Sequence, residues 1–287
     1  MLSPIQPLKP YTIVIIGYGR VGRFFEGLFN LIPHIQVMIK TREQQDYPKA
    51  DLFLICVQDQ EIPKVAKELE NHVQSSAFGV VHCSGFRSLS ILEPLKNLGC
   101  QIAVIHPVAP ITYNTVSAEN MVMDALGDDE LMVLFEYWCS EWGAYFVPVT
   151  EAQKQSIHVA AVMSCNYLMS LYGHVQKYLV AQGMESVEAN HMVQGMMSIS
   201  LQELDFGSVE SSLTGPIIRG DLQTIQHHLQ LLDGQRSVLD LYRSLGTSTL
   251  DLIEEFTQKP LNATIQEMRA LFSNTNESSL GHERTKD

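Results

Sequence analysis

Short apolar runs alternate with helix-like patterns through the first half of the chain. The runs are apolar on both faces, which is typical of strands that are buried on both sides of a sheet. The predicted strands are Thr12–Ile16, Gln36–Ile39, Leu52–Val57, Gly79–His82, Ile102–Ile105 and Ala144–Val149. Because helical patterns separate them, we predict an α/β fold with a doubly wound parallel sheet; a mixed α+β sheet is the alternative.

The pattern changes after Pro148, where strand-like runs stop and long helical patterns begin. Thr150 and Gln153 have the spacing of a capping box, which starts a helix. Nothing interrupts the helical pattern up to Ala181, and Gly183 follows as a stop signal. The predicted helix has few charged groups and is apolar nearly all round, so we expect it to be buried in a bundle or between subunits.

Three more helical patterns follow, and together they predict an all-α C-terminal domain. They cover Ser186–Leu204, Leu222–Leu232 and Gln235–Glu255. We therefore divide the chain into a dinucleotide-binding domain (1–150), a helical substrate or dimerisation domain (151–272) and a disordered polar tail (273–287).

Charge and cysteine content exclude several classes of protein. The chain of 287 residues has 19 basic and 32 acidic side chains and a formal net charge of -13, which argues against nucleic acid or an anionic membrane as a partner. Its five cysteines form no C-x-x-C pair, so a disulfide framework or a zinc site is not expected. With no secretory signal pattern at the N-terminus, we expect a cytoplasmic protein.

A glycine motif follows the first predicted strand and opens a helical pattern. It reads Gly17-Tyr18-Gly19-Arg20-Val21-Gly22. In this strand–turn–helix context, the first glycine permits a tight turn, the second lets backbone amides approach a pyrophosphate, and the third lets helix and strand pack closely. The positive end of the helix then faces the phosphates, so the motif predicts a Rossmann dinucleotide site. A tight turn without a ligand is the alternative.

The end of the second strand indicates which dinucleotide is bound. A site for NAD places an acidic residue there to bind the ribose 2′-hydroxyl, whereas this chain has Lys40, Thr41 and Arg42. Two cations and a hydroxyl would attract the 2′-phosphate of NADP, so we predict NADP over NAD. Glu43 would reverse this preference if the strand ended one or two positions later.

Loops after later strands should also reach the cofactor, because ligands of open α/β sheets bind outside the carboxyl ends of the strands. The expected contacts near the nicotinamide are Val57, Gln58, Ser84, Gly85, His106 and Pro107. This placement follows from topology rather than from a specific motif.

The motifs together resemble one family of NADP-dependent oxidoreductases, which joins a Rossmann domain to a helical domain of formerly unknown function. The resemblance rests on Gly17–Gly22, the loops around Cys56–Asp59, His82–Gly85 and His106-Pro107, the helix containing Ile157–Ala161 and Cys165–Tyr167, and Leu213–Asp221 with His228-Leu229. It implies NADP as the cofactor and a homodimer with interlocked helical domains.

More distant relatives suggested by the resemblance are 6-phosphogluconate dehydrogenase-like and pyrroline-carboxylate reductase-like enzymes. The hydroxy-acid dehydrogenases among them carry Lys and Asn four residues apart on the first long helix. Here Lys154 is followed four residues later by His158, so their chemistry does not transfer directly. His106-Pro107 is similar to the His-Pro pair of prephenate dehydrogenases, which makes such an enzyme a further alternative.

Three residues of the first long helix are candidates for proton transfer, which must accompany hydride transfer to a carbonyl or imine. Lys154 and His158 share one helix face, Cys165 continues that face, and Asn166 lies beside it. The imidazole of His158 could donate or accept the proton, and Lys154 could polarise a substrate oxygen. The alternatives are a solvated Lys154, a core His158 bonded to a backbone carbonyl, and an Asn166 that caps a neighbouring segment.

Two residues of the Leu213–Asp221 motif are candidates for substrate binding. Arg219 could bind a substrate carboxylate through two hydrogen bonds, or pair with a buried acid at a subunit interface. Asp221 is also a plausible N-cap of the following helix.

The sequence thus favours an NADP-dependent oxidoreductase acting on a small polar, carboxylate-bearing metabolite. The main rival is an NADP-binding sensor or scaffold without catalysis. The chain lacks the G-x-S-x-G and H-E-x-x-H motifs and zinc-ligand spacing, so hydrolase and metal sites are not predicted.

Overall fold

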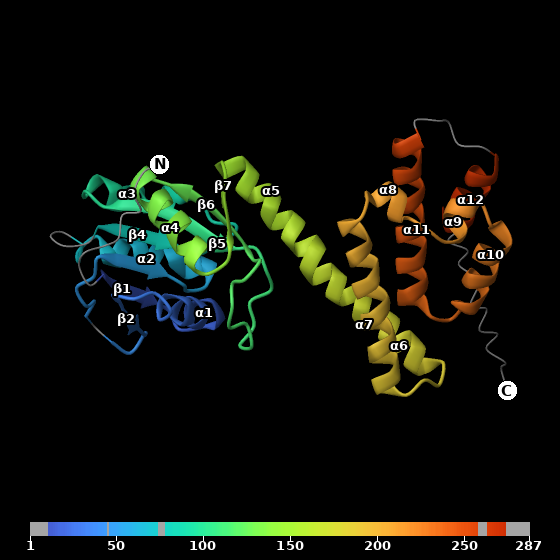
Figure 1. Cartoon of the computed structure of the whole chain (residues 1–287), viewed down its shortest axis with the longest axis horizontal. Helices are drawn as coiled ribbons and strands as arrows, with labels where there is room; N and C mark the ends of the chain where they lie inside the picture. The colour runs from blue at the N-terminus through green and yellow to red at the C-terminus, as the bar shows by residue number, and fades with distance from the viewer. Residues whose placement is uncertain (1–10, 45, 74–77, 258–262, 274–287) are drawn as a thin grey trace, which may run out of the picture. The chain divides into compact units, whose positions relative to one another are not determined.

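The computed structural model describes residues 11–44, 46–73, 78–257 and 263–273 (Figure 1). The chain divides into two compact units, Met1–Tyr167 and Leu168–Asp287. Each is described by itself below. The predicted tail, 273–287, lies outside the described residues except for Ser273, which ends the last helix.

The first unit contains a seven-stranded sheet in the order β2-β1-β3-β4-β5-β6-β7. The strands are β1 (Tyr11–Ile16), β2 (Ile35–Lys40), β3 (Leu52–Ile55), β4 (Gly79–His82), β5 (Gln101–Pro107), β6 (Val122–Gly127) and β7 (Tyr145–Pro148). Strands β2, β1, β3, β4 and β5 are parallel, whereas β6 runs antiparallel to β5 and β7 runs parallel to β6. The α/β prediction is confirmed; β6 is the strand that the sequence pattern did not reveal.

Helices cover both faces of this sheet. Successive residues of a strand point to opposite faces, so Ile13 and Ile15 of β1 pack on one side and Val14 and Ile16 on the other. The first side is covered by α1 (Arg20–Phe29) and α4 (Asp129–Glu141). The second is covered by α2 (Ile62–Leu69) and α3 (Glu93–Asn97), which follow the short helices η1 (Asp59–Glu61) and η2 (Leu89–Leu92).

An aromatic cluster fixes α1 on the sheet. The ring of Phe29 packs edge-on against Trp138 and Trp142 of the α4 region, at centroid distances of 5.0 and 5.1 Å. The indole N–H of Trp142 donates to the backbone carbonyl of Leu28 at 3.0 Å. Because these large side chains are buried, they contribute much of the energy that holds the C-terminal end of α1 on the sheet.

Helical conformation runs from Glu151 to Ala181, as predicted, but with a change of geometry in the middle. It consists of α5 (Glu151–Ala161), a π-helical turn η3 (Val162–Tyr167) and α6 (Leu168–Ala181). The predicted Thr150 capping box is present. A π-turn holds more residues than an α-turn, so it rotates all later positions around the helix. The prediction that Cys165 continues the face of His158, which assumed a straight α-helix, is therefore wrong.

The second unit is entirely helical in its described residues, which confirms the predicted all-α domain. After α6 come α7 (Ser186–Gln202), η4 (Glu203–Asp205), α8 (Val209–Ser212), α9 (Pro216–Arg219), α10 (Leu222–Leu231), α11 (Arg236–Thr257) and α12 (Ala263–Ser273). Its buried core is small and is formed by Ile225, Leu250, Met268 and Phe272, from α10, α11 and α12.

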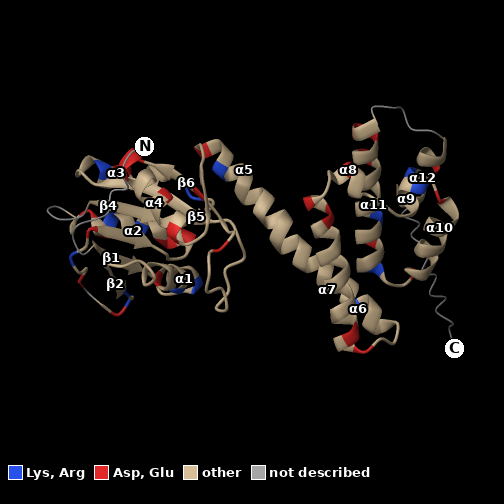
Figure 2. Ribbon diagram, in the orientation of Figure 1, with Lys and Arg blue, Asp and Glu red and all other residues tan. Residues whose placement is uncertain are grey.

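Helices α6 and α7 lie side by side and leave much apolar surface exposed. Each carries a single charged residue, Lys177 in α6 and Glu188 in α7, and both helices are almost entirely tan in Figure 2. Within the described chain, no residue of α6 is buried. The expectation that this helix is covered is therefore not met by one chain alone. No helix of the described residues is long and apolar enough to cross a membrane.

Candidate functional site

The glycine motif forms a close-packed turn at the carboxyl end of β1. Gly17 has a φ of +96°, and a Cβ there would lie 2.8 Å from the Val57 side chain and 2.9 Å from the Cys56 carbonyl oxygen. A Cβ at Gly22 would lie 2.1 Å from the carbonyl oxygen of Gly17. Larger residues are therefore excluded at both positions, as the sequence predicted.

Gly19, in contrast, faces open space. Among the described residues, no heavy atom lies within 4 Å of a Cβ built there. Gly19 is the N-cap of α1, and no side chain of the described structure caps this helix. The first amides of a helix have no partner inside the helix. The turn thus presents free N–H groups and the positive helix end to an open position, which fits an anionic group such as a pyrophosphate.

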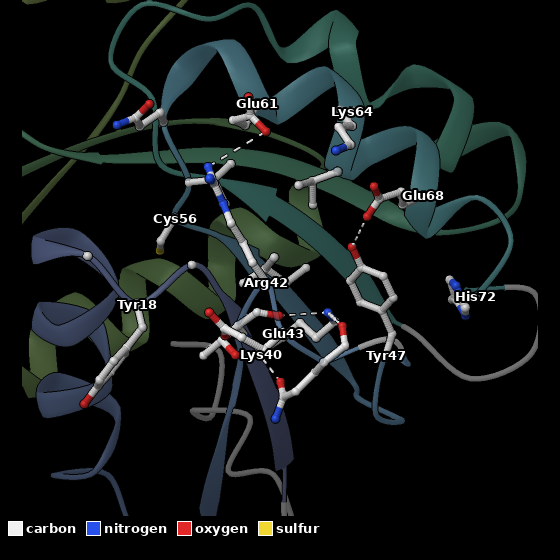
Figure 3. Close-up of a pocket in the computed structure, with 18 of the residues that line it drawn as sticks. Tyr18, Lys40, Arg42, Glu43, Tyr47, Cys56, Glu61, Lys64, Glu68 and His72 are labelled. Atoms are coloured by element: carbon white, nitrogen blue, oxygen red, sulfur yellow. Dashed lines mark hydrogen bonds and ion pairs between the residues drawn. The ribbon is translucent and has the colours of Figure 1, made fainter.

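A cavity of about 860 Å³ begins at this turn and extends along the ends of β2 and β3 (Figure 3). Of the predicted cofactor residues, it is lined by Gly17, Tyr18, Gly19, Lys40, Thr41, Arg42, Val57 and Gln58. It lies at the topological switch point between β1 and β3, where the order of the strands in the sheet changes direction. Ligands of open α/β sheets usually bind at such a point. The lining residues that the sequence did not predict include Gln44, Tyr47, Glu61, Lys64, Glu68 and His72.

Lys40, Thr41 and Arg42, which were predicted to bind the adenosine ribose with its 2′-phosphate, differ in how available their polar groups are. The Lys40 amine donates to the backbone carbonyls of Thr41 and Gln44 and lies 4.9 Å from the centre of the Tyr47 ring. Lys40 is buried and committed to its own loop, so it is not a free phosphate ligand. Its structural role is to hold the loop that carries Thr41 and Arg42.

Arg42 is the exposed cation at this end of the cavity. Its guanidinium lies 3.9 Å from the Glu61 carboxylate, and Figure 3 shows it reaching toward Glu61. Its side chain is 79% exposed, so this ion pair is weak and an incoming phosphate can compete for the guanidinium. Glu43 also lines the cavity, and a hydrogen bond from the Thr41 side chain holds the pKa of its carboxyl below the ordinary value.

A second group of polar residues gathers at the ends of β4 and β5. A Cβ on Gly85 would lie 2.7 Å from Nε2 of His106 and 2.9 Å from Nδ1 of His158. The two imidazole rings are 6.1 Å apart at an angle of 63°. Gly85 thus lies between two histidines, and the absent side chain leaves room for both rings. The predicted residues Gly85, His106 and His158 are brought together here.

His106 is held by an acid from the unpredicted strand. Residues His106 and Asp124 are directly opposite in the β5–β6 pairing. The Nδ1 atom of His106 lies 3.1 Å from Oδ2 of Asp124. Asp124 is 1% exposed, and its other oxygen, Oδ1, is buried without a hydrogen-bond partner in the described structure. An acid buried so deeply requires a compensating group, and His106 is the group bonded to it.

Lys154 is an internal anchor rather than a solvated residue. It is fully buried, and its amine donates to the carbonyl oxygen of Arg87 at 2.7 Å. Burial lowers the pKa of Lys154 below its ordinary value, while Glu151, Asp124 and Asp59 act in the opposite direction. The alternative of a solvated Lys154 is therefore wrong. Because Lys154 ties α5 to the loop after β4, it positions His158, one helical turn later, beside Gly85.

His82, at the end of β4, binds backbone groups of the loop that follows this strand, and its imidazole is neutral there. Its Nδ1 accepts from the Ser84 N–H at 3.2 Å, and its Nε2 is 3.3 Å from the Ser88 carbonyl oxygen, which requires a proton on Nε2 only. Burial lowers the pKa of His82 to about 4. Sequence reasoning did not select His82, since a histidine inside a buried strand gave no signal of this role.

The remaining predicted residues lie in three other places. Ser84 is buried in the same loop, where its hydroxyl accepts from the N–H groups of Phe86 and Arg87. Asn166 is exposed in the π-turn. In the second unit, Arg219 is exposed at the end of α9, and Asp221 caps α10 by accepting from the Thr224 N–H at 3.0 Å. The predicted N-cap is therefore confirmed, and its carboxylate is occupied by Thr224.

Sequence comparisons match two domain descriptions to this chain. Residues 30–107 match a Rossmann-like domain, and residues 121–249 match a domain of unknown function, DUF2520. Among curated proteins, none matches the sequence of the chain.

For three solved structures with the same fold, the matched region includes nearly all of the other protein's chain. A protein of Bacteroides fragilis described as an NADP oxidoreductase has 18% identity and a TM-score of 0.66, covering 82% of this chain and 96% of that one. The pyrroline carboxylate reductase of Plasmodium falciparum, solved with NADP bound, has 11% identity and a TM-score of 0.61, covering 92% and 99%. The 1-pyrroline-5-carboxylate reductase of Streptococcus pyogenes has 15% identity and a TM-score of 0.57, covering 91% and 98%.

At these identities the likeness shows a shared fold. The domain matches and the fold agree with the family that the sequence motifs resemble. Residues 30–107 are thus similar to a Rossmann-like domain, and residues 121–249 are similar to the DUF2520 domain.

Proposed function

We propose that the protein is an NADP-dependent oxidoreductase that transfers hydride to or from a small polar, carboxylate-bearing metabolite. The observation that carries this proposal is the arrangement of the sheet edge. Arg42 and its cavity, the open Gly19 turn, and the histidines around Gly85 lie at the carboxyl ends of strands that are ordered β2, β1, β3, β4 and β5 in the sheet. A dinucleotide bound along this edge would have its phosphates at the turn and its nicotinamide toward the histidines.

The proposed contacts divide this edge between the two halves of the cofactor. Thr41 and Arg42 bind the adenosine ribose with its 2′-phosphate, and the first turn of α1 binds the pyrophosphate. Ser84, Gly85, His106 and Pro107 remain the proposed contacts near the nicotinamide. His158 faces the same position from α5 and is proposed to contact the substrate. The bound dinucleotide would supply the hydride.

A homodimer is part of the proposal. Met192, Met196 and Ile199 of α7 are 47%, 51% and 61% exposed, and α6 exposes further apolar side chains. Exposed apolar patches of this kind mark interaction surfaces. A second copy of the chain would cover them, as the family resemblance implies. Arg219 then remains a proposed ligand of the substrate carboxylate or of an acid at that interface. Cys56, Cys83, Cys139 and Cys165 form no disulfide, in keeping with a proposed cytoplasmic location.

Dinucleotide binding tests the first step. NADPH and NADH are titrated against the wild-type protein, Gly19→Ala and the control Gly27→Ala, which lies in the same helix and also faces open space. We expect Gly19→Ala to fold normally and to weaken NADPH binding, because its methyl group projects where the phosphate would lie. Gly27→Ala should bind as the wild type does. Wild-type protein that binds neither dinucleotide would overturn the proposal.

Cofactor preference is tested at two charged residues of the cavity, Arg42 and Glu43. Arg42→Ala should weaken NADPH binding by about 10- to 100-fold, since a charge-assisted hydrogen bond contributes about 1.5–3 kcal/mol, and should leave NADH nearly unaffected. Glu43→Gln should not weaken NADPH binding. If Glu43→Gln instead weakened NADH and the wild type bound NADH more tightly, Glu43 would be the ribose ligand and the preference would be NAD.

Turnover separates an enzyme from a sensor. NADPH oxidation is followed with a panel of small keto and imino carboxylates, and NADP reduction with the matching hydroxy and amino carboxylates. We expect turnover with at least one compound, and a large loss of kcat in His158→Ala with NADPH affinity unchanged. Tight NADPH binding without turnover across the panel would instead favour the sensor or scaffold.

A further inference from the structure

The buried acid Asp124 needs an explanation that the fold alone does not provide. Aspartate is unfavourable in strands, and a carboxylate that is 1% exposed is costly unless its charge is compensated. Asp124 nevertheless occupies the middle of β6, where it faces His106 across the strand pair. Its Oδ1 has no hydrogen-bond partner in the described residues. Its Oδ2 is bonded to His106, and this bond is the contact that a buried acid at this position provides.

The bond to Asp124 also fixes how His106 presents its ring. With Nδ1 directed to Asp124 at 3.1 Å, Nε2 lies on the other side of the ring, where a Cβ on Gly85 would come within 2.7 Å of it. The side chain of His106 is 16% exposed, so the ring retains some access to the outside. A carboxylate behind one nitrogen holds the imidazole in one tautomer and stabilises its protonated form.

We propose that His106 is the catalytic acid–base residue of the reaction and that Asp124 is its positioning residue. This inference rests on the proposed function and deepens it. In the reductive direction, the substrate carbon receives hydride from the dinucleotide, and the electron pair of the C=O or C=N bond moves to the heteroatom. That atom takes the proton from Nε2 of His106. The imidazole is left neutral, with its Nδ1–H still donated to Asp124, and regains a proton from water. In the oxidative direction, neutral Nε2 accepts the proton.

The other titratable groups of this cluster are less suited to the task. Both nitrogens of His82 are used by backbone groups, and the amine of Lys154 is bonded to the Arg87 carbonyl. His158 faces Gly85 with Nδ1, but that atom is buried without a partner in the described structure, so no acid fixes its tautomer. His106 combines a carboxylate on one nitrogen with a free direction for the other. His158 is then the residue that contacts the substrate from the opposite side.

The test compares Asp124→Asn and His106→Asn with the control Asp51→Asn. Asp51 is a matched choice, because its carboxylate also accepts a hydrogen bond within the sheet, from the Thr12 N–H at 2.8 Å, but lies outside the site. For each full-length protein we measure the Kd for NADPH and, with a substrate from the panel, kcat and KM. In the proteins that retain His106, the rate at which diethylpyrocarbonate modifies it is followed by peptide mass spectrometry.

We expect Asp124→Asn and His106→Asn to lower kcat by about 100-fold or more, the usual contribution of acid–base catalysis. In Asp124→Asn, KM and the Kd for NADPH should stay within about twofold of wild type. Modification of His106, measured at a pH at which the imidazole is neutral, should slow several-fold in Asp124→Asn, because asparagine neither holds the proton on Nδ1 nor raises the electron density at Nε2 as a carboxylate does. Bound NADPH should protect His106. The control should match the wild type in all three measurements.

An Asp124→Asn protein that keeps kcat and the His106 modification rate within twofold of wild type would overturn the inference, even if NADPH binding confirms the proposed function. Wild-type protein without NADPH affinity would instead count against the proposed function. If no substrate is found, the modification rates decide, and an unchanged rate in Asp124→Asn rejects the pair. If Asp124→Asn does not fold, the modification of His106 in the wild-type protein is the test. The inference is rejected if His106 does not react with diethylpyrocarbonate, or if NADPH does not protect it.

Discussion

The two units of this molecule bury their apolar residues to very different extents. In the first unit, two apolar clusters fill both faces of the sheet, and the polar residues gather along the carboxyl edge. In the second, the buried core is confined to a few residues of α10, α11 and α12, and apolar side chains of α6 and α7 remain exposed. The sheet of the first unit is covered on both faces within a single copy, whereas the second unit has more apolar surface than its own fold covers.

The largest expected effect is in the first unit, where the fold leaves no space. Gly22→Ala would bring a methyl group 2.1 Å from the carbonyl oxygen of Gly17, so α1 must move away from β1. We expect a loss of about 3 kcal/mol or more in the free energy of unfolding, together with loss of NADPH binding. Chemical denaturation measures the first and fluorescence titration the second. Gly27→Ala, in the open part of the same helix, should be at least as stable as wild type, because alanine favours a helix over glycine.

The comparison predicts that charge on α7 affects assembly rather than folding. Met196 and Ile199 are three residues apart and lie on one face of the helix. The double variant Met196→Glu/Ile199→Glu should raise the dimer dissociation constant by about 100-fold or more, which corresponds to about 2.7 kcal/mol. Sedimentation velocity measures this change. Leu231→Glu, which alters an equally exposed apolar residue in α10, is the control and should leave the assembly unchanged. A wild-type monomer would contradict the prediction.

Acid should weaken the first unit through His82. The pKa of His82 is lowered from its ordinary value of 6.5 to about 4, so between these values the unfolded chain binds a proton that the folded protein does not. The free energy of unfolding therefore falls as the pH falls from about 6.5 to 4. We expect about 2 kcal/mol of loss between pH 7 and pH 5 from this group. His82→Gln should remove that part of the pH dependence. Equal slopes in both proteins would contradict the assignment.

The smallest expected effect concerns the limited core of the second unit. A Cβ on Gly246 would lie 2.6 to 2.8 Å from the ring of Phe272, which packs α12 on α11. Alanine normally stabilises a helix relative to glycine, but here the overlap should dominate and cost about 1–2 kcal/mol. Thermal unfolding measures it. Combining Gly246→Ala with Phe272→Leu should cost less than the sum of the two single changes; simple additivity would show that the contact is not responsible.

Much of the fold was predictable, because it depends on local signals. The glycine motif, the six apolar strands and the Thr150 capping box each specify a short segment by themselves. Strand β6 was missed because its central residue, Asp124, is typical of turns rather than strands. Its burial makes sense only beside His106, which is distant in the sequence and adjacent in the sheet.

The candidate site was predicted less completely for the same reason. The sequence placed Gly85, His106 and His158 near the cofactor, but whether a charged side chain is free depends on contacts between distant segments. Lys40 and Lys154 were both expected to face ligands, and the structure commits their amines to backbone carbonyls. The π-turn is also invisible in the pattern, because a single extra residue in one helical turn leaves the apolar periodicity almost unchanged.

The pairing of β5 with β6 has a consequence for exchanging modules between related proteins. The Rossmann-like match ends at residue 107 and therefore contains His106, whereas the DUF2520 match starts at residue 121 and contains Asp124. A chimera joined in the gap between these matches would inherit the imidazole from one parent and its carboxylate from the other, and would also split the sheet. The junction of such a chimera should therefore lie after β7, so that His106 and Asp124 come from the same parent.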